Sequence, residues 1–124
     1  MIFGIGIDEI EVARIEKQIQ KEAGFKERVF TSAEIEYCES KKYRAQHYAA
    51  RFAAKEAFMK AVGTGWRDGL AFNEIEIVKD ELGRPALVLY GKAKEITDKH
   101  KITNIHVSLS HIKELANAIV TLEK

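Results

Sequence analysis

One long helical segment, from about Tyr43 to Val62, constrains the fold of this sequence more than any other part of it. It is rich in alanine, contains no proline and is followed by Gly63, a residue typical of the end of a helix. At helical spacing an acid shares one face with small and apolar residues and a lysine: Ala49, Phe52, Ala53, Glu56 and Lys60. A buried acid is costly unless a cation meets it, so we expect either Lys60 or a metal ion beside Glu56. The alternative is an ordinary exposed Glu56–Lys60 pair, one helical turn apart.

The composition indicates one globular domain that spans residues 1–124. Hydrophobic residues make up 46% and charged residues 31%, which excludes a disordered chain. A net charge of +1 argues against the usual strongly basic nucleic-acid-binding protein. With Cys38 as the one cysteine, neither an internal disulfide nor a cysteine zinc cluster is expected. No apolar run approaches the roughly 18 residues of a membrane span, and the residues around Asp8 and Glu9 do not resemble a signal peptide. We therefore expect a cytoplasmic protein that binds neither membranes nor nucleic acid.

Helix and strand patterns along the chain predict an α+β fold. Thr31 and Glu34 fit a capping box at the start of a short helix, and the turn at Asp80–Gly83 joins two strands into a hairpin. Gly24 is expected to end the first helix. The predicted helices cover about 10–22, 32–41, 43–62 and 92–100, and the predicted strands cover about 1–7, 75–78, 85–90, 105–109 and 116–122. We expect a mainly antiparallel sheet of about five strands, packed with the long central helix.

The first predicted strand runs into an acid, Asp8. A dinucleotide-binding fingerprint needs a third glycine where Glu9 stands, and the sequence has no Walker A motif. We expect Asp8 to cap the following helix, to bind a ligand, or to do both. Asp8 and Glu56 together suit Mg²⁺, because that ion takes one or two carboxylates and completes its shell with water and substrate phosphates. No paired histidine spacing points to zinc.

Cations surround the acid on the long helix. Arg51, Lys55 and Lys60 lie within about two and a half turns, and Gly63-Thr-Gly65 follows them. With a metal ion, these cations and the exposed amides of a glycine turn provide what a pyrophosphate needs. A solvated charged face that ends in glycine explains the same residues.

Two further polar patterns stand on other elements. Strand alternation puts His106, Ser108 and Ser110 on one face. Because a G-x-S-x-G elbow is missing, ligand binding by this face is favoured over nucleophilic catalysis, and a half-exposed strand face is the alternative. A basic stripe near the first helix either docks an acidic partner or meets only water; it consists of Arg14, Lys17, Lys21 and Arg28.

These fragments, in this order, resemble the holo-[acyl-carrier-protein] synthases, which are small single-domain phosphopantetheinyl transferases. The similarity covers nearly the whole chain. It is carried by Gly4-x-Gly6-x-Asp8 with Arg14, by Phe30-Thr31 with Glu34, by Arg51-Phe-Ala-Ala-Lys-Glu56 up to Gly65, by Gly69-Leu-Ala-Phe-Asn73, by Asp80–Pro85 and by His106–His111. The family usually has an apolar residue where Glu9 stands. Glu9 is therefore either an additional acid near the metal or an outward-pointing residue without a role.

The resemblance implies transfer of the 4′-phosphopantetheine arm of coenzyme A to a serine of an acyl carrier protein in fatty acid biosynthesis, with release of adenosine 3′,5′-bisphosphate. It implies that Asp8 and Glu56 bind Mg²⁺, with Mn²⁺ as the alternative ion, and that Lys60 is the third catalytic residue. The coenzyme A contacts that it implies are Arg51, Lys55, Lys60, Gly63, Thr64, Gly65, Arg84, Pro85, His106 and Ser108. The implied carrier-docking residues are Arg14, Lys17, Lys21 and Arg28. It also implies a homotrimer with active sites between subunits.

Two other classes of protein keep part of this pattern. A non-catalytic nucleotide-binding module needs the basic and glycine features but not both carboxylates. A regulatory or interaction domain needs only the basic first helix. For a transferase, the sequence leaves open whether Glu56 or a metal-bound water accepts the serine proton, which carrier proteins are accepted, and whether acylated coenzyme A is used.

Overall fold

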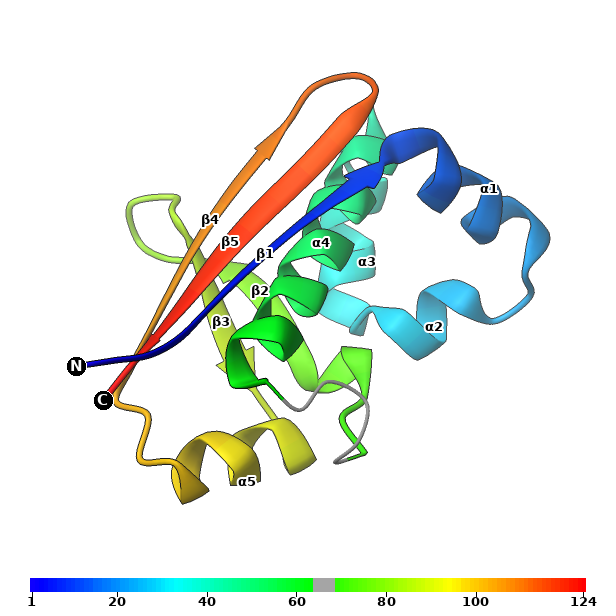
Figure 1. The fold of residues 1–124 in the computed structure, drawn as a ribbon. Coiled ribbons are helices and arrows are strands. Elements are labelled where there is room, and N and C mark those ends of the chain that lie inside the picture. Colours follow the sequence, from blue (N-terminus) through cyan, green and yellow to red (C-terminus); the bar gives the residue numbers. More distant parts are fainter. Residues whose placement is uncertain (64–68) are drawn as a thin grey trace.

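The computed structural model describes residues 1–63 and 69–124, and it has the predicted α+β architecture (Figure 1). A long helix, α4, lies against one face of an antiparallel sheet. Shorter helices and a β-hairpin surround it. The helices are α1 (Val12–Lys21), α2 (Phe25–Val29), α3 (Ser32–Glu39), α4 (Arg44–Val62) and α5 (Gly91–Lys99), with the short 3-10 helix η2 at Phe72–Glu74. The strands are β1 (Ile2–Glu11), β2 (Ile75–Lys79), β3 (Pro85–Leu89), β4 (Asn104–His111) and β5 (Leu115–Glu123).

The five strands are antiparallel, as predicted, but they form two sheets. One sheet has the order β1-β5-β4, and β2 pairs with β3 in the other. The first strand of the chain therefore pairs with the last. The hairpin of β2 and β3 lies beside β4, whereas α1 follows the far end of β1 (Figure 1). Residue patterns predict where strands lie but not which strands pair, so the division into two sheets could not be read from the sequence.

Two glycines of β1 let that strand lie directly on the last turns of α4. A Cβ atom on Gly4 would overlap the carbonyl oxygen of Ala61, and one on Gly6 would overlap that of Ala57. Only glycine permits such a close approach of two backbones. This contact sets the position of Asp8, which follows in the same strand.

The alanine-rich surface of α4 forms much of the core. Tyr48 and Phe58 are fully buried on this helix, and Val120 and Leu122 of β5 are buried against it. As predicted, α4 ends at Gly63, whose left-handed backbone (φ 90°) allows its N–H to donate to the Met59 carbonyl. The capping box at Thr31 and Glu34 is also present.

Two predicted boundaries are wrong. Asp8 does not cap a helix, because pairing with β5 extends β1 to Glu11, and Glu11 is the residue before α1. Gly24 does not end α1, which stops at Lys21. Instead its left-handed backbone (φ 82°) starts α2, a short helix that the sequence did not predict. In the described part of the chain no helix has the length and apolar character to cross a bilayer.

Candidate active site

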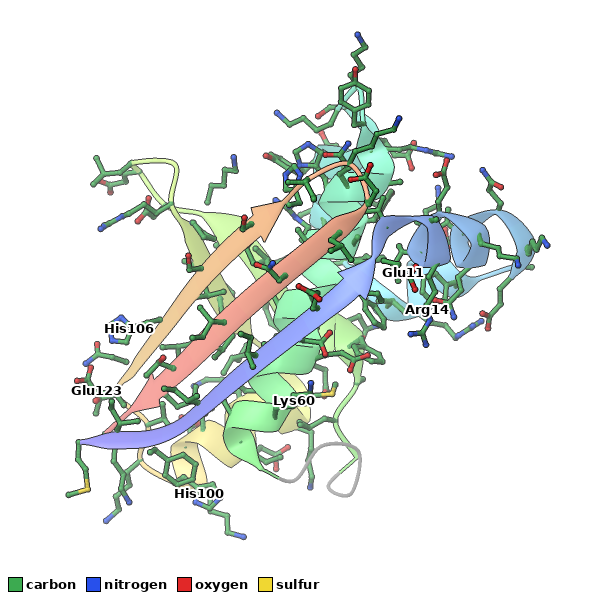
Figure 2. The ribbon with its side chains drawn as sticks, turned by 45° about the horizontal axis from the view of Figure 1, so that its top comes forward. Glu11, Arg14, Lys60, His100, His106 and Glu123 are labelled. Atoms are coloured by element: carbon green, nitrogen blue, oxygen red, sulfur yellow. The ribbon has the colours of Figure 1, made fainter. Side chains whose placement is uncertain are left out.

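Asp8, Glu56 and Lys60 come together where β1 crosses the last turns of α4. The Lys60 ammonium donates to Asp8 Oδ1 at 2.9 Å and to the Ile7 carbonyl oxygen at 3.0 Å. Lys60 thus reaches across to β1 (Figure 2). Its ion-pair partner in the described structure is Asp8, and the expected pair with Glu56 on the same helix is not formed. We call Asp8, Glu56 and Lys60 the carboxylate cluster.

Glu56 lies in an environment that resists ionisation. Burial raises its pKa, and the Asp8 carboxylate raises it further, while Lys60 and Arg14 act in the opposite direction. Four charged groups therefore interact at this point, and Arg14 of α1 is one of them. A cation added beside Asp8 and Glu56 would relieve the repulsion between the two acids.

The donor set of the carboxylate cluster fits an open Mg²⁺ site. Its two acids offer hard oxygen ligands from a strand and a helix that are packed together. No group of three or more His, Cys, Asp or Glu residues able to hold a metal exists among residues 1–63 and 69–124. An ion at Asp8 and Glu56 would therefore keep positions for water and for substrate oxygens, which is the coordination that Mg²⁺ commonly shows.

An apolar groove of about 470 Å³ opens beside Glu56. Its walls come from α2, α4 and the segment around η2, and they consist of Phe25, Val29, Phe52, Leu70, Ala71 and Phe72. Polar groups line it as well: Gln18, Glu22, Arg28 and Glu56. The groove therefore joins the predicted docking helices to the carboxylate cluster.

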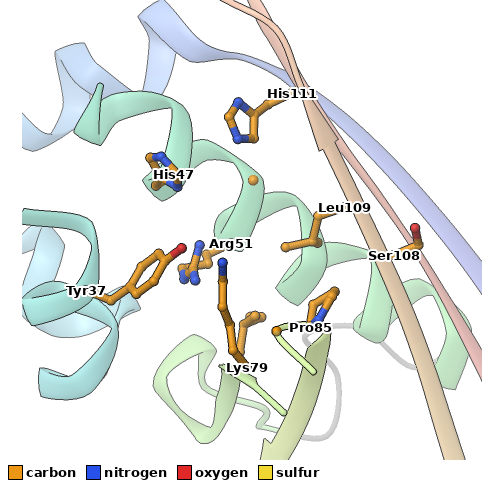
Figure 3. Close-up of a pocket in the computed structure, with 11 residues that line it drawn as sticks. Tyr37, His47, Arg51, Lys79, Pro85, Ser108, Leu109 and His111 are labelled. Atoms are coloured by element: carbon orange, nitrogen blue, oxygen red, sulfur yellow. The ribbon is translucent and has the colours of Figure 1, made fainter. Parts of the chain in front are cut away.

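A second pocket, of about 220 Å³, lies on the other side of α4 and carries several cations (Figure 3). Arg51 is only 4% exposed, and its Nε has no hydrogen-bond partner in the described part of the chain. Its guanidinium lies 4.2 Å from the ring centre of Tyr37. We call this the cationic pocket; its lining includes Tyr37, His47, Arg51, Lys79, Pro85, Ser108 and His111.

The charges of this pocket shift the ionisation of its neutral groups. Burial alone would raise the pKa of Tyr37, but a hydrogen bond from Lys79 and the charges of Lys79, Arg51 and Lys41 lower it overall. Burial lowers the pKa of His47 to about 4, helped by His111, Arg51, Lys41 and Lys79. His47 is therefore neutral at pH 7. The pocket thus combines a neutral histidine with a buried arginine whose Nε lacks a hydrogen-bond partner among the described residues. Such a pocket favours an anion.

Lys55 lies elsewhere than expected for a ligand-binding residue. Its fully buried ammonium donates to Glu34 Oε1 at 2.8 Å, to the Phe72 carbonyl at 3.0 Å and to the Ile75 carbonyl. Burial lowers its pKa, and the Glu34 carboxylate opposes that shift. These contacts tie α4 to α3 and β2 and give Lys55 a structural role, and the expectation that Lys55 also contacts coenzyme A stays a prediction.

The other expected coenzyme A contacts are dispersed. Pro85 and Ser108 line the cationic pocket, and Gly63 ends α4. Arg84 donates to Asp80 in the β2–β3 turn at 3.0 Å, and His106 pairs with Glu123 at 3.0 Å on the surface. Thr64 and Gly65 lie outside the described residues.

The expected carrier-docking residues differ in the contacts that they make within the described part of the chain. Arg28 contacts the Glu22 carboxylate and the Ala23 carbonyl. Arg14 acts on Glu56, as described above. Lys17 and Lys21 are exposed on α1. The departure at Glu9 is resolved by strand alternation, because Glu9 is exposed on the face of β1 opposite to Asp8. Glu9 is therefore not an additional acid at the carboxylate cluster of its own chain.

The predicted site residues thus fall into two groups at opposite edges of one sheet. Asp8 lies on β1 and Ser108 on β4, with β5 between them. Sequence reasoning missed Tyr37, His47, Lys79 and His111 of the cationic pocket. Lys79 and His111 each end a strand, which is a weak signal, and nothing in the sequence linked Tyr37 and His47 to Arg51.

Comparison with known proteins identifies the class. A family model described as the 4′-phosphopantetheinyl transferase superfamily matches residues 4–120, and the chain belongs to this superfamily. Within it, the chain is similar to the holo-[acyl-carrier-protein] synthases. It is 51% identical to that of Geobacter sp. (strain M21), over 100% of both chains.

Solved structures of holo-[acyl-carrier-protein] synthases share the fold. That of Neisseria meningitidis superposes with a TM-score of 0.90 at 34% identity and covers 100% of both chains. That of Bacillus anthracis, in complex with CoA (3′,5′-ADP), has a TM-score of 0.81 at 41% identity and covers 98% of this chain and 96% of its own.

Proposed function

We propose that the chain transfers the 4′-phosphopantetheine group of coenzyme A to a serine of an apo acyl carrier protein and releases adenosine 3′,5′-bisphosphate. The observation that carries this proposal is the carboxylate cluster, in which Asp8 and Glu56 converge beside Lys60. The relative from Bacillus anthracis, which binds coenzyme A, supports it. Fatty acid biosynthesis is the process that consumes such a holo-carrier, and we place the chain in the cytoplasm, in keeping with its single, buried cysteine.

Asp8 and Glu56 are the residues that would hold Mg²⁺ in this enzyme, with Mn²⁺ as the alternative ion. The ion supplies positive charge against the coenzyme A pyrophosphate. Lys60 offsets negative charge on the phosphate oxygens as the pantetheine phosphorus is transferred. The serine Oγ forms a new bond to that phosphorus, and the bond to adenosine 3′,5′-bisphosphate breaks. The raised pKa of Glu56 suits it to accept the serine proton.

The cationic pocket is the proposed site for the nucleotide end of coenzyme A. Arg51 and Lys79 provide charge for a phosphate, and Pro85 and Ser108 line the same pocket. This pocket and the carboxylate cluster lie at opposite edges of the three-stranded sheet, so one chain does not place them side by side. We infer that a site is completed between copies, in a homotrimer.

The outer face of the three-stranded sheet supports such an assembly. Ile5 and Ile7 of β1 and Ile119 of β5 are exposed there at 57%, 63% and 40%, and Ile7 lies directly opposite Ile119. Large apolar side chains next to one another on an exposed sheet face are typical of an interface.

The apolar groove beside Glu56 is the proposed entry for the carrier protein. The basic residues Arg14, Lys17, Lys21 and Arg28 lie on α1 and α2 near this groove and suit an acidic carrier surface. Apolar walls next to the serine acceptor position would bury a side chain that flanks the serine.

Incubation with an apo acyl carrier protein, coenzyme A and Mg²⁺ tests the proposed function. Intact-protein mass spectrometry should show a gain of one phosphopantetheine on the carrier, and Asp8→Asn should abolish it. A carrier that a known synthase modifies must serve as the substrate. If that carrier gains no mass with this chain, the transferase function is refuted.

A further inference from the structure

Lys60 contacts strand β1 at two points rather than one. Its ammonium donates to Asp8 Oδ1 at 2.9 Å and to the main-chain carbonyl of the preceding residue, Ile7, at 3.0 Å. Both acceptors belong to consecutive residues of β1. The ammonium is therefore held at a defined place beside the acid, although it comes from another element.

The two partners of this ion pair differ in their contact with water. The Asp8 side chain is 13% exposed, whereas that of Lys60 is 55% exposed. A carboxylate that is largely withdrawn from water needs a countercharge. A lysine that is half in water, on a long flexible stem, can leave with little loss. Asp8 therefore needs a countercharge, whereas Lys60 loses little free energy when the ion pair breaks.

The geometry points to Lys60 as a placeholder for the metal ion, because its ammonium neutralises Asp8 until the ion binds and then turns to the substrate phosphates. This inference rests on the proposed function, since it takes Asp8 and Glu56 as the metal ligands. An ammonium and a divalent cation on one carboxylate repel each other within a few ångströms, so each weakens the other there.

The same competition links metal binding to substrate binding. A coenzyme A pyrophosphate attracts the Lys60 ammonium away from Asp8 and so removes the ion's competitor. Coupling between two ligands is reciprocal, so coenzyme A strengthens metal binding by the factor by which the metal strengthens coenzyme A binding. Lys60 contributes part of this coupling factor, so the factor becomes smaller when Lys60 is replaced.

Mn²⁺ binding to the full chain, measured by electron paramagnetic resonance without coenzyme A, tests the inference. Lys60→Met should tighten Mn²⁺ binding by about fivefold or more, because one nearby positive charge is removed. Lys60→Arg keeps the charge and should bind Mn²⁺ as the wild type does. Lys94→Met is the matched control: Lys94 pairs with Asp98 at 3.3 Å on the exposed surface of α5 and should have no effect.

Coenzyme A provides the second arm of the test. Saturating coenzyme A should tighten Mn²⁺ binding in the wild type by a larger factor than in Lys60→Met, and Asp8→Asn should remove the gain from Lys60→Met. If the wild type binds Mn²⁺ through Asp8 but Lys60→Met binds it equally or more weakly, the placeholder role is overturned and the proposed function stands. If the wild type binds no Mn²⁺ with or without coenzyme A, the metal site itself is refuted, and the placeholder with it.

Discussion

Two residues of this chain, Glu56 and His47, lie in surroundings that oppose their charged forms. Glu56 is an acid whose surroundings favour its neutral form, and His47 is a base whose surroundings favour its neutral form. Residues of this kind are frequent at functional sites, because function selects a charge arrangement that stability alone does not. We therefore expect that replacing either residue changes the stability of the protein as well as its activity.

Replacing Glu56 by glutamine should abolish transfer and stabilise the metal-free protein above neutral pH. Transfer should fall by at least about 100-fold, because a metal ligand and proton acceptor is lost. The raised pKa means that the folded state resists ionisation of Glu56, so wild-type stability declines as pH rises from the unfolded-state pKa of 4.5 through the folded-state pKa. The variant escapes this decline. Thermal melts at pH 8 and pH 4 check it: the variant's advantage should be present at pH 8 and small at pH 4, and normal transfer in the variant would contradict the assigned role.

His47→Gln should weaken the acid sensitivity of the fold. The folded-state pKa of about 4 lies below the ordinary histidine pKa of 6.5, so the unfolded state takes up the proton first as pH falls. Wild-type stability therefore declines between about pH 6.5 and pH 4 by a contribution that the variant lacks. Urea unfolding of both proteins at pH 7 and pH 4.5 measures it. An equal loss in the two proteins would show that His47 is protonated as freely as in water.

At the scale of elements, α4 does most to organise the site. One face carries Glu56 and Lys60 to β1, another carries Arg51 into the cationic pocket, and Lys55 points into a buried network with Glu34. The sequence predicted this helix, its end at Gly63 and the acid on its apolar face. It could not predict which cation would meet which acid, because the partners of Lys55 and Lys60 come from α3 and β1, distant in the sequence.

The glycine contact between β1 and α4 predicts a coupled loss of stability and activity. In Gly6→Ala the new Cβ meets the Ala57 carbonyl oxygen, so β1 must move away from α4 and Asp8 moves with it. We expect a destabilisation of about 2–3 kcal/mol in urea and a transfer rate lowered by more than the folded fraction explains. Gly69→Ala is the control: its backbone is left-handed (φ 73°), unlike that of Gly6, but nothing lies within 4 Å of the new atom. That variant should lose only about 1 kcal/mol and keep full activity per folded molecule.

At the scale of the whole molecule, the main feature is that the predicted site residues lie at two opposite edges of the three-stranded sheet. The sequence predicted the three residues of the carboxylate cluster, which the structure brings together, but it missed several side chains that line the cationic pocket. It did not predict their distribution, since the order β1-β5-β4 follows from long-range pairing and not from any local pattern. Arg51 and Asp8 illustrate this: both were assigned to one ligand, yet β5 separates the edges at which they act.

Complementation between two inactive variants tests the assembly directly. Asp8→Asn removes the carboxylate cluster and Arg51→Ala removes the cationic pocket, so neither protein should transfer alone. In mixed oligomers, produced by co-expression with two different tags, some sites combine intact Asp8 of one chain with intact Arg51 of another. Transfer by the doubly purified mixture should therefore recover to a sizeable fraction of the wild-type rate. No recovery, in mixtures that contain both tags, would place each complete site within a single chain.

The pairing of the first strand with the last also determines when the site can form during synthesis. Asp8 emerges from the ribosome well before β5, the strand in which β1 has its ladder partner. Closing so long a loop is slow, and an unpaired strand edge exposed meanwhile invites association with other chains. The nascent chain must therefore keep β1 soluble until Leu115–Glu123 has been made. The acid at the centre of the proposed chemistry is therefore translated long before the strand whose pairing fixes its final place.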